Sequence, residues 1–154
     1  MADSTVGSGG TYSDLSTWEA ATDNDLVSTT TIERALLLNQ TFTLTAGLVV
    51  SGATTNSSYY REITTDAGAS FVDNANVRTN ALTFNTANGA AITSTTAYVQ
   101  PLVLLDEGYA RLTKLQIRTT ASTSYAVRIG ANTQVTQCII DCNGVVYGGL
   151  ELTN

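Results

Sequence analysis

The chain has 154 residues, a formal net charge of −6 and 13% charged residues, a length that suits one domain with a substantial core. With 7 basic residues against 13 acidic ones, it offers no basic patch to neutralise phosphates, which excludes a nucleic-acid groove. No stretch approaches the roughly 20 apolar residues of a membrane span, and the first residues lack the features of a secretory signal. We therefore expect a protein made in a cytoplasm, without nucleic-acid or membrane partners.

The N-terminal region predicts an arm followed by a helix. Residues 1–12 are polar and glycine-rich, which indicates a flexible or docking arm. Ser13–Ala21 is the one good helix candidate, with cap residues at its start and a Ser16-x-x-Glu19 capping box. Leu15 and Trp18 lie at helical spacing. We expect this helix to act as a cap that lays Trp18 over the open end of the core of a domain spanning residues 13–154.

The middle of the chain predicts strands joined by turns. Threonine is the commonest residue, 27 of 154, and such threonine-rich, β-branched segments are typical of strands. Asp66–Asn80 carries Gly, Asp and Asn turn signals and is predicted as a long loop. Regular coils are expected from about residue 98 onward. The strands predicted before that point are Thr30–Leu38, Thr41–Thr45, Gly47–Val50, Tyr59–Thr64, Ala81–Phe84 and Ala90–Ile92.

The last third of the chain repeats itself. Arg111–Ile129 aligns with Gln134–Leu152 at an offset of 23 residues, and Leu102–Leu104 precedes Val127–Ile129 by 25 residues. A fixed period in the low twenties is typical of a solenoid, in which each repeat is one coil that cannot bury its apolar face alone. The signature of leucine-rich repeats, which have a similar period, is absent.

Inward and outward residues alternate within each repeat, as in a strand with one buried face. The residues expected to face inward are Thr113, Leu115, Ile117, Thr119, Thr136, Cys138, Ile140 and Cys142, with Val127, Ile129, Leu150 and Leu152 in the second strand. Those expected to face outward are Lys114, Gln116, Arg118, Gln137, Ile139 and Asp141. The predicted fold class is all-β: a right-handed parallel β-helix solenoid with a short N-terminal capping helix, because parallel crossovers are almost always right-handed.

Two outward pairs of opposite charge support this register. Arg118 would stack on Asp141 and Arg128 on Glu151, each pair joining adjacent coils. Such neighbours contribute only about 0.2–1 kcal/mol each. Their value is diagnostic, since a slip of one residue would turn them into the core.

The two cysteines, Cys138 and Cys142, are expected to be small core residues. They lie four residues apart in one strand, about 13 Å at roughly 3.3 Å per residue. This exceeds the Cα separation of about 7 Å that a disulfide permits. The chain contains no histidine to complete a metal site with them.

Residues 7–21 (Gly-Ser-Gly-Gly-Thr-Tyr-Ser-Asp-Leu-Ser-Thr-Trp-Glu-Ala-Ala) resemble the opening of right-handed parallel β-helix, pectate-lyase-like proteins of tailed phages. Thr41–Thr45, Tyr59–Ile63 and Tyr109–Ile117 resemble the strands that follow in that family. The resemblance covers most of the chain through structural motifs. It implies a virion structural protein, made in the host cytoplasm and located in the virion. Related folds include pectate lyases and tailspike depolymerases, so the fold alone leaves the function open.

An enzyme of this architecture would act on polysaccharide through paired carboxylates, or through a Ca²⁺ site with a basic proton acceptor. Asp23 and Asp25 occupy a predicted loop, and Asp106 and Glu107 precede a glycine in a predicted turn. The remaining candidates, Asp141 and Glu151, have predicted arginine partners. We therefore expect no enzyme, no catalytic residue, no cofactor and no metal.

Outward tyrosines offer a glycan-binding alternative. The available residues are Tyr59, Tyr60, Tyr98, Tyr109, Tyr125 and Tyr147. Tyr125 and Tyr147 recur at nearly the repeat spacing, which favours a structural column over a ligand site.

Apolar residues outside the core predict an interface. Val103 and Ile139 are expected to face outward, and the core stops without a cap at Leu150 and Leu152, so either a partner covers this edge or further coils follow. Burial would centre on the C-terminal coils and on the loop Asp66–Asn80. The predicted function is a structural component of a bacteriophage virion: a surface, spike, fibre-base or capsid-associated protein.

Its expected partners are other virion proteins, through a homotrimer or through docking on capsid or tail subunits, with a host glycan as a further candidate. The alternatives are a polysaccharide lyase or depolymerase, and a non-catalytic glycan-binding module on the same fold.

Overall fold

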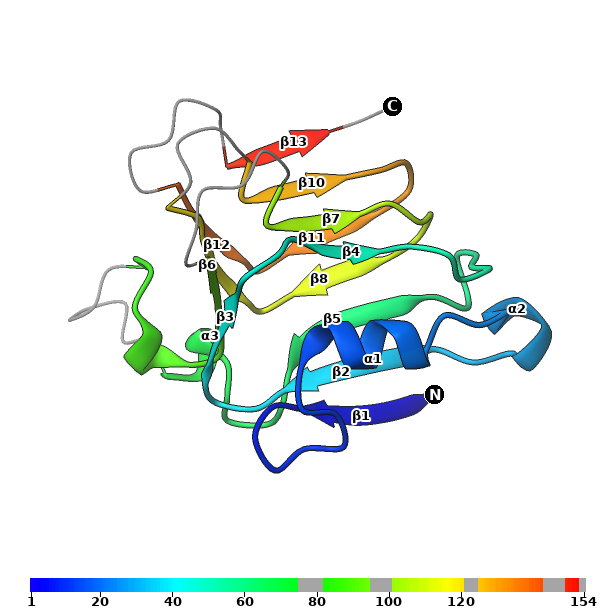
Figure 1. The fold of residues 1–154 in the computed structure, drawn as a ribbon, viewed down its shortest axis with the longest axis horizontal. Helices are drawn as coiled ribbons and strands as arrows, with labels where there is room; N and C mark the ends of the chain where they lie inside the picture. The colour runs from blue at the N-terminus through cyan, green and yellow to red at the C-terminus, as the bar shows by residue number, and fades with distance from the viewer. Residues whose placement is uncertain (75–81, 95–100, 121–124, 143–148, 153–154) are drawn as a thin grey trace.

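The computed structural model describes residues 1–74, 82–94, 101–120, 125–142 and 149–152, which form mostly strands in parallel sheets, with few helices (Figure 1). The strands are β1 (Ala2–Val6), β2 (Glu33–Leu37), β3 (Thr41–Leu44), β4 (Leu48–Val50), β5 (Arg61–Thr65), β6 (Ala91–Ser94), β7 (Val103–Leu105), β8 (Arg111–Thr113), β9 (Gln116–Arg118), β10 (Val127–Ile129), β11 (Gln134–Thr136), β12 (Ile139–Asp141) and β13 (Leu150–Leu152). The helices are α1 (Leu15–Ala21), α2 (Leu26–Thr29), α3 (Phe71–Asn74) and the 3₁₀ helix η1 (Thr86–Asn88).

The strands form three sheets, and every pairing among the described strands is parallel. Sheet 1 has the order β1-β2-β5-β8-β11, sheet 2 the order β3-β6-β9-β12, and sheet 3 the order β4-β7-β10-β13. From β2 onward the chain visits sheets 1, 2 and 3 in the same order four times. We call each such passage a coil, and successive coils lie side by side from β1 towards β13 (Figure 1).

The 23-residue offset of the last two coils is confirmed by their strand pairing. Gln116 pairs with Ile139, and Val127 pairs with Leu150. The offset of 25 residues to the preceding coil is wrong by one, because Val127 pairs with Val103 rather than with Leu102. Val103 was therefore predicted on the wrong face: it points inward and is completely buried. A slip of one residue exchanges the two faces of a strand.

The continuous strand predicted from Thr113 is interrupted by a corner in each of the last two coils. Lys114 has a φ of 60° and Gln137 a φ of 53°, both in the left-handed region. The corner separates β8 from β9 and β11 from β12, so the alternation restarts after it. Before the corner the prediction is wrong, because the side chains that pack in or against the core are Leu112 and Val135, rather than Thr113 and Thr136. After the corner Leu115 and Ile117 face inward as predicted.

The N-terminal residues belong to the sheet structure. β1 pairs with β2 along its whole length, Val6 is completely buried, and Arg34 of β2 forms an ion pair of 2.6 Å with Asp3. The flexible or docking arm predicted for residues 1–12 is therefore wrong for this strand. Its inward positions before Val6 are Ala2 and Ser4, which are too small and polar to produce a strong strand pattern in the sequence.

The predicted helix is present as α1, with a different cap. Asp14 is the N-cap residue, and its side chain accepts a hydrogen bond of 2.8 Å from the Thr17 amide. The predicted Ser16-x-x-Glu19 capping box does not form. Leu15 and Trp18 are both completely buried, and α1 contacts β1 and β4 at the end of the stack where sheet 3 begins.

Three other segments differ from their predicted boundaries. Residues 26–29 form α2, so the first strand of this region begins at Glu33 rather than at Thr30. The predicted loop Asp66–Asn80 contains α3, and its last six residues lie outside the described residues. Leu82–Phe84 is not a strand, and Ala81, Tyr98 and Tyr147 also lie outside the described part of the chain.

The core is built from inward columns that run across the coils. Each buried aliphatic side chain of this size contributes about 1.5–3 kcal/mol. The columns contain Ile63, Leu112 and Val135 in sheet 1, Ile92, Ile117 and Ile140 in sheet 2, and Leu48, Val103, Val127 and Leu150 in sheet 3.

Candidate assembly surface and buried ionic network

The last coil lies at the free edge of all three sheets. β11, β12 and β13 each occupy the terminal position in the strand order of their sheet. The outer backbone N–H and C=O groups of these strands therefore have no ladder partner among the described strands. Such an edge is a template for pairing with another chain.

The core is open at this edge. Val127 is completely buried and Ile129 is 8% exposed, but their neighbours on β13, Leu150 and Leu152, are 44% and 71% exposed. The contrast arises because β10 has a strand on each side, whereas β13 has one on only one side. Leu150 and Leu152 thus combine the inward direction predicted from the sequence with exposure at the end of the stack.

The two ion pairs predicted between the last coils are confirmed. Arg118 lies 2.5 Å from Asp141, and Arg128 lies 3.0 Å from Glu151. All four side chains are between 29% and 42% exposed. The guanidinium of Arg118 also lies over the ring of Phe84, 4.0 Å from its centroid. The sequence reasoning missed the role of Phe84, because it lies 34 residues before Arg118 in a segment predicted as a strand.

Ile139 lies on the outer side of β12, beside an apolar groove of about 580 Å³. Two exposed apolar residues from the segment that contains α3 and follows it border this groove: Val72 is 43% exposed and Leu82 is 58% exposed. The groove is lined by Phe71, Val72, Leu82, Gln137, Cys138, Ile139 and Ile140. The sequence signal for its far wall is the apolar pair Phe71-Val72 inside an otherwise polar loop.

Both cysteines are free thiols that pack against the core. Burial raises the pKa of Cys138 to about 11, and burial also raises the pKa of Cys142. A raised thiol pKa keeps the group protonated and weakly nucleophilic at neutral pH. These residues therefore behave as small apolar groups.

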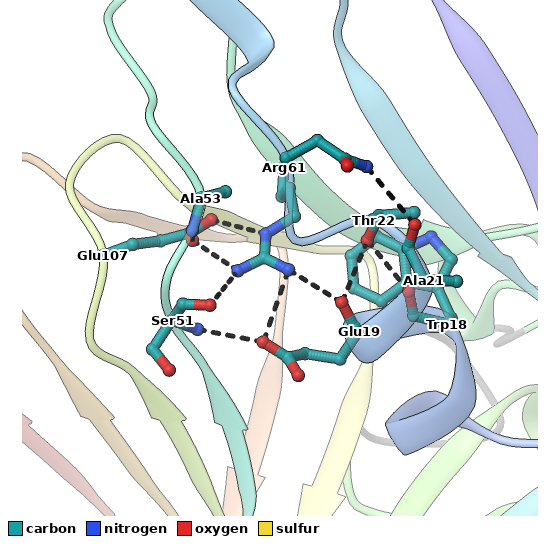
Figure 2. A network of polar contacts seen from close by, with 9 residues as sticks. Trp18, Glu19, Ala21, Thr22, Ser51, Ala53, Arg61 and Glu107 are labelled. Atoms are coloured by element: carbon teal, nitrogen blue, oxygen red, sulfur yellow. Dashed lines mark hydrogen bonds and ion pairs between the residues drawn. The ribbon is translucent and has the colours of Figure 1, made fainter.

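A buried ionic network joins α1 to the coils (Figure 2). Arg61 on β5 has a completely buried side chain, and its guanidinium forms two hydrogen bonds with the carboxylate of Glu107, that from Nε being 2.7 Å long. Its other nitrogens donate to the backbone carbonyl of Ser51 at 2.7 Å and to that of Glu19 at 3.1 Å. The Glu19 carboxylate lies 3.3 Å from Arg61 and accepts a hydrogen bond from the Ser51 amide at 3.2 Å.

The network satisfies a charge that the core would otherwise reject. Glu107 also accepts a hydrogen bond from the Ala53 amide, and the Arg61 guanidinium lies 6.0 Å from the centre of the Trp18 ring. The partners come from α1, from the segments after β4 and β7, and from β5. Because they converge from separate parts of the chain, the network fixes the cap helix against the second and third coils. The sequence reasoning placed Glu107 in an ordinary turn and did not consider Arg61.

The carboxylates considered for catalysis lie in different places. Asp25 caps α2 by accepting a hydrogen bond from the Ser28 amide at 3.0 Å, and Asp106 follows β7 on the surface. Glu107, Asp141 and Glu151 each have an arginine partner. Within the described residues, no group of three or more Asp, Glu, Cys or His side chains is placed to hold a metal ion.

The described tyrosines are partly buried rather than aligned on one outer face. Tyr60 lies under the guanidinium of Arg111, 3.5 Å from ring centroid to Cζ, and its hydroxyl accepts a hydrogen bond from the same arginine at 2.7 Å. This contact joins the second coil to the third. The predicted column of Tyr125 and Tyr147 involves a residue outside the described part of the chain.

In comparisons with known proteins, no family model, no curated protein and no solved structure matches this chain. The resemblance to phage β-helix proteins therefore stays a prediction. Among the described residues there is no helix with the length and apolar character needed to cross a membrane.

Proposed function

We propose that this chain is a right-handed parallel β-helix and a structural component of a bacteriophage virion, acting by assembly at the surface, at a spike or fibre base, or on the capsid. The repeated passage through three parallel sheets in one order supports the solenoid. Crossovers between parallel strands are right-handed in about 98% of cases, which supports the handedness.

The observation that carries the assembly function is the open last coil. Three parallel strand edges and the exposed Leu150 and Leu152 lie together there. An exposed apolar surface next to unpaired strand edges is costly in water and promotes uncontrolled association unless a partner covers it. The groove beside Ile139 extends this apolar surface on the outer side of the same coil.

The pairing of the carboxylates favours an assembly role over a polysaccharide lyase. A lyase needs carboxylates free to bind Ca²⁺ or to transfer a proton. Asp141 and Glu151 instead neutralise arginines of the preceding coil, and Glu107 neutralises a buried arginine. These carboxylates serve the coil stack.

The direct test is the protein content of purified phage particles. Density-gradient-purified particles of a phage that encodes this chain should contain it at a fixed copy number by quantitative mass spectrometry. Absence from intact particles contradicts the proposal.

A second test separates assembly from catalysis. The purified chain is incubated with capsular and cell-wall glycans, and new reducing ends or unsaturated products are assayed. We expect no product. Reproducible product that disappears in Asp106→Ala or Asp141→Ala would establish a depolymerase instead, and the matched control is Asp73→Ala on α3.

A further inference from the structure

Outward charges alternate in sign across the coils. In sheet 1 one outward column runs through Asp3, Arg34, Glu62, Arg111 and Gln134, in that order. Opposite charges therefore face each other at every charged step, and the column ends on a neutral residue. Cross-strand neighbours of opposite charge stabilise a sheet, and like charges directly opposite destabilise it.

The charged columns of the other two sheets end differently. In sheet 2 Arg118 is followed by Asp141, and in sheet 3 Arg128 is followed by Glu151. Each acid has an arginine on its inner side and an open position on its outer side. A strand added at this edge would complete the alternation if it placed a basic residue over the acid.

The sheet 3 edge specifies the pattern of such a strand. β13 has the sequence Leu150-Glu151-Leu152, and its inner neighbour β10 has the sequence Val127-Arg128-Ile129 in register with it. β10 thus supplies two apolar side chains and one arginine against the inner edge of β13. The exposed leucines and the acid between them offer the same complement on the outer edge.

A second copy of this chain does not supply that complement. The charged outward residues of the described last coil are Asp141 and Glu151, so two copies joined at this edge would bring carboxylates together. At the opposite end of the stack, β3 presents Thr43, and the β4 position is covered by α1. No described strand at either end of the stack offers an arginine or lysine to Glu151.

We propose that β13 takes an added strand from a different protein, and that this strand has a basic residue between two apolar residues. Recognition is by strand addition: the backbone provides the ladder, the leucines bury the apolar side chains, and Glu151 selects arginine or lysine. This inference rests on the proposed assembly function and names the chemistry of the partner segment.

The probe is a fluorescent peptide with the sequence of residues 125–131, Tyr-Ala-Val-Arg-Ile-Gly-Ala, and its matched control has glutamate in place of arginine. Fluorescence anisotropy should show that the arginine peptide binds about five- to ten-fold more tightly than the control at low salt, because one favourable cross-strand pair replaces one unfavourable pair. Higher salt should reduce this preference.

Variants of the protein locate the binding site. Glu151→Gln should abolish the preference between the two peptides, whereas Asp3→Asn, at the other end of the stack, should leave it unchanged. Thermal unfolding of both variants verifies that they fold. Equal binding of the two peptides, binding of neither, or a preference that survives Glu151→Gln overturns the inference.

Failure of the peptide test is distinguishable from failure of the proposed function. Particles that contain the chain, together with peptides that do not discriminate, refute the strand-addition site alone. Discriminating peptides together with particles that lack the chain refute the virion role alone.

Discussion

Arg61 is the residue whose environment departs most from its chemistry. It points into the core from β5, and the carboxylate of Glu107 and backbone carbonyls from two other segments satisfy its guanidinium. A fully buried ion pair contributes little net stability, because the desolvation of both charges offsets their attraction. Removing one partner alone is costly, since the other charge stays buried without compensation.

We expect Arg61→Ala to lower the free energy of unfolding by about 3–5 kcal/mol, because Glu107 would remain buried and unpaired. Urea denaturation measures the change. The control is the double variant Arg61→Met with Glu107→Leu, which removes both charges and should be far closer to the wild type. A loss below about 1 kcal/mol in the single variant would show that the network is open to water.

Cys138 provides a pH-dependent prediction. Burial raises the pKa of its thiol to about 11, whereas an unfolded thiol titrates near 8.5. The unfolded state therefore loses its proton first, so the contribution to stability is complete below about pH 8.5 and is lost as the pH rises towards 11.

At pH 8, labelling of Cys138 by iodoacetamide should be at least about ten-fold slower in the folded protein than in urea, because the thiolate is the reactive form. A Cys142→Ala background isolates the signal of Cys138. Equal labelling rates in the folded and the unfolded chain would contradict this burial.

Among the elements, α1 is held by its cap and by its buried face. The Asp14 side chain accepts hydrogen bonds from the Thr17 amide and from the hydroxyls of Ser13, Ser16 and Thr17, and the Thr17 amide is the largest cause of the lowered pKa of Asp14. The helix has only seven residues, too few to persist in isolation. Its persistence therefore depends on this cap and on the burial of Leu15 and Trp18.

Asp14→Ala should lower the free energy of unfolding by about 0.5–2 kcal/mol at neutral pH, because an N-cap acceptor is lost. The lowered pKa means that this contribution is present above the unfolded pKa of about 3.9 and is lost as the pH falls through the folded value. The difference between variant and wild type in chemical denaturation should therefore shrink in strong acid. Asp14→Asn, which keeps a cap acceptor, is the control, and a difference independent of pH would contradict the role of the carboxylate.

Across the whole molecule, the coils contact mainly their neighbours, as in other solenoids. The two ends are unequal: α1 packs on the first coils, while the described residues place no element over the last one. Local stability in such a stack depends on how many neighbours a coil has.

Native-state hydrogen exchange should therefore be slowest in β5, β8 and β9 and fastest in β11, β12 and β13. The physical reason is that Ile63 and Ile117 are buried between coils, whereas Leu152 is 71% exposed. Mass spectrometry of peptic fragments provides the measurement. Uniform protection across the coils would show that the last coil is covered in solution, for instance by self-association.

Periodicity made the last two coils predictable. The 23-residue repeat aligned Arg118 with Asp141 and Arg128 with Glu151, and both ion pairs are present because identical coil lengths bring the same positions together. The buried face of α1 was also predictable, since helical spacing places Leu15 beside Trp18.

Only the tertiary structure decided the features that depend on unequal coils. β4 and β7 pair across an offset of 55 residues, and the next coil takes 24, so a three-residue alternation could not locate the face of Val103. Corners at Lys114 and Gln137 reset the alternation, because a left-handed residue turns the chain into another sheet. Arg61 meets Glu107 across 46 residues, a pairing set by the stacking of coils rather than by any local pattern.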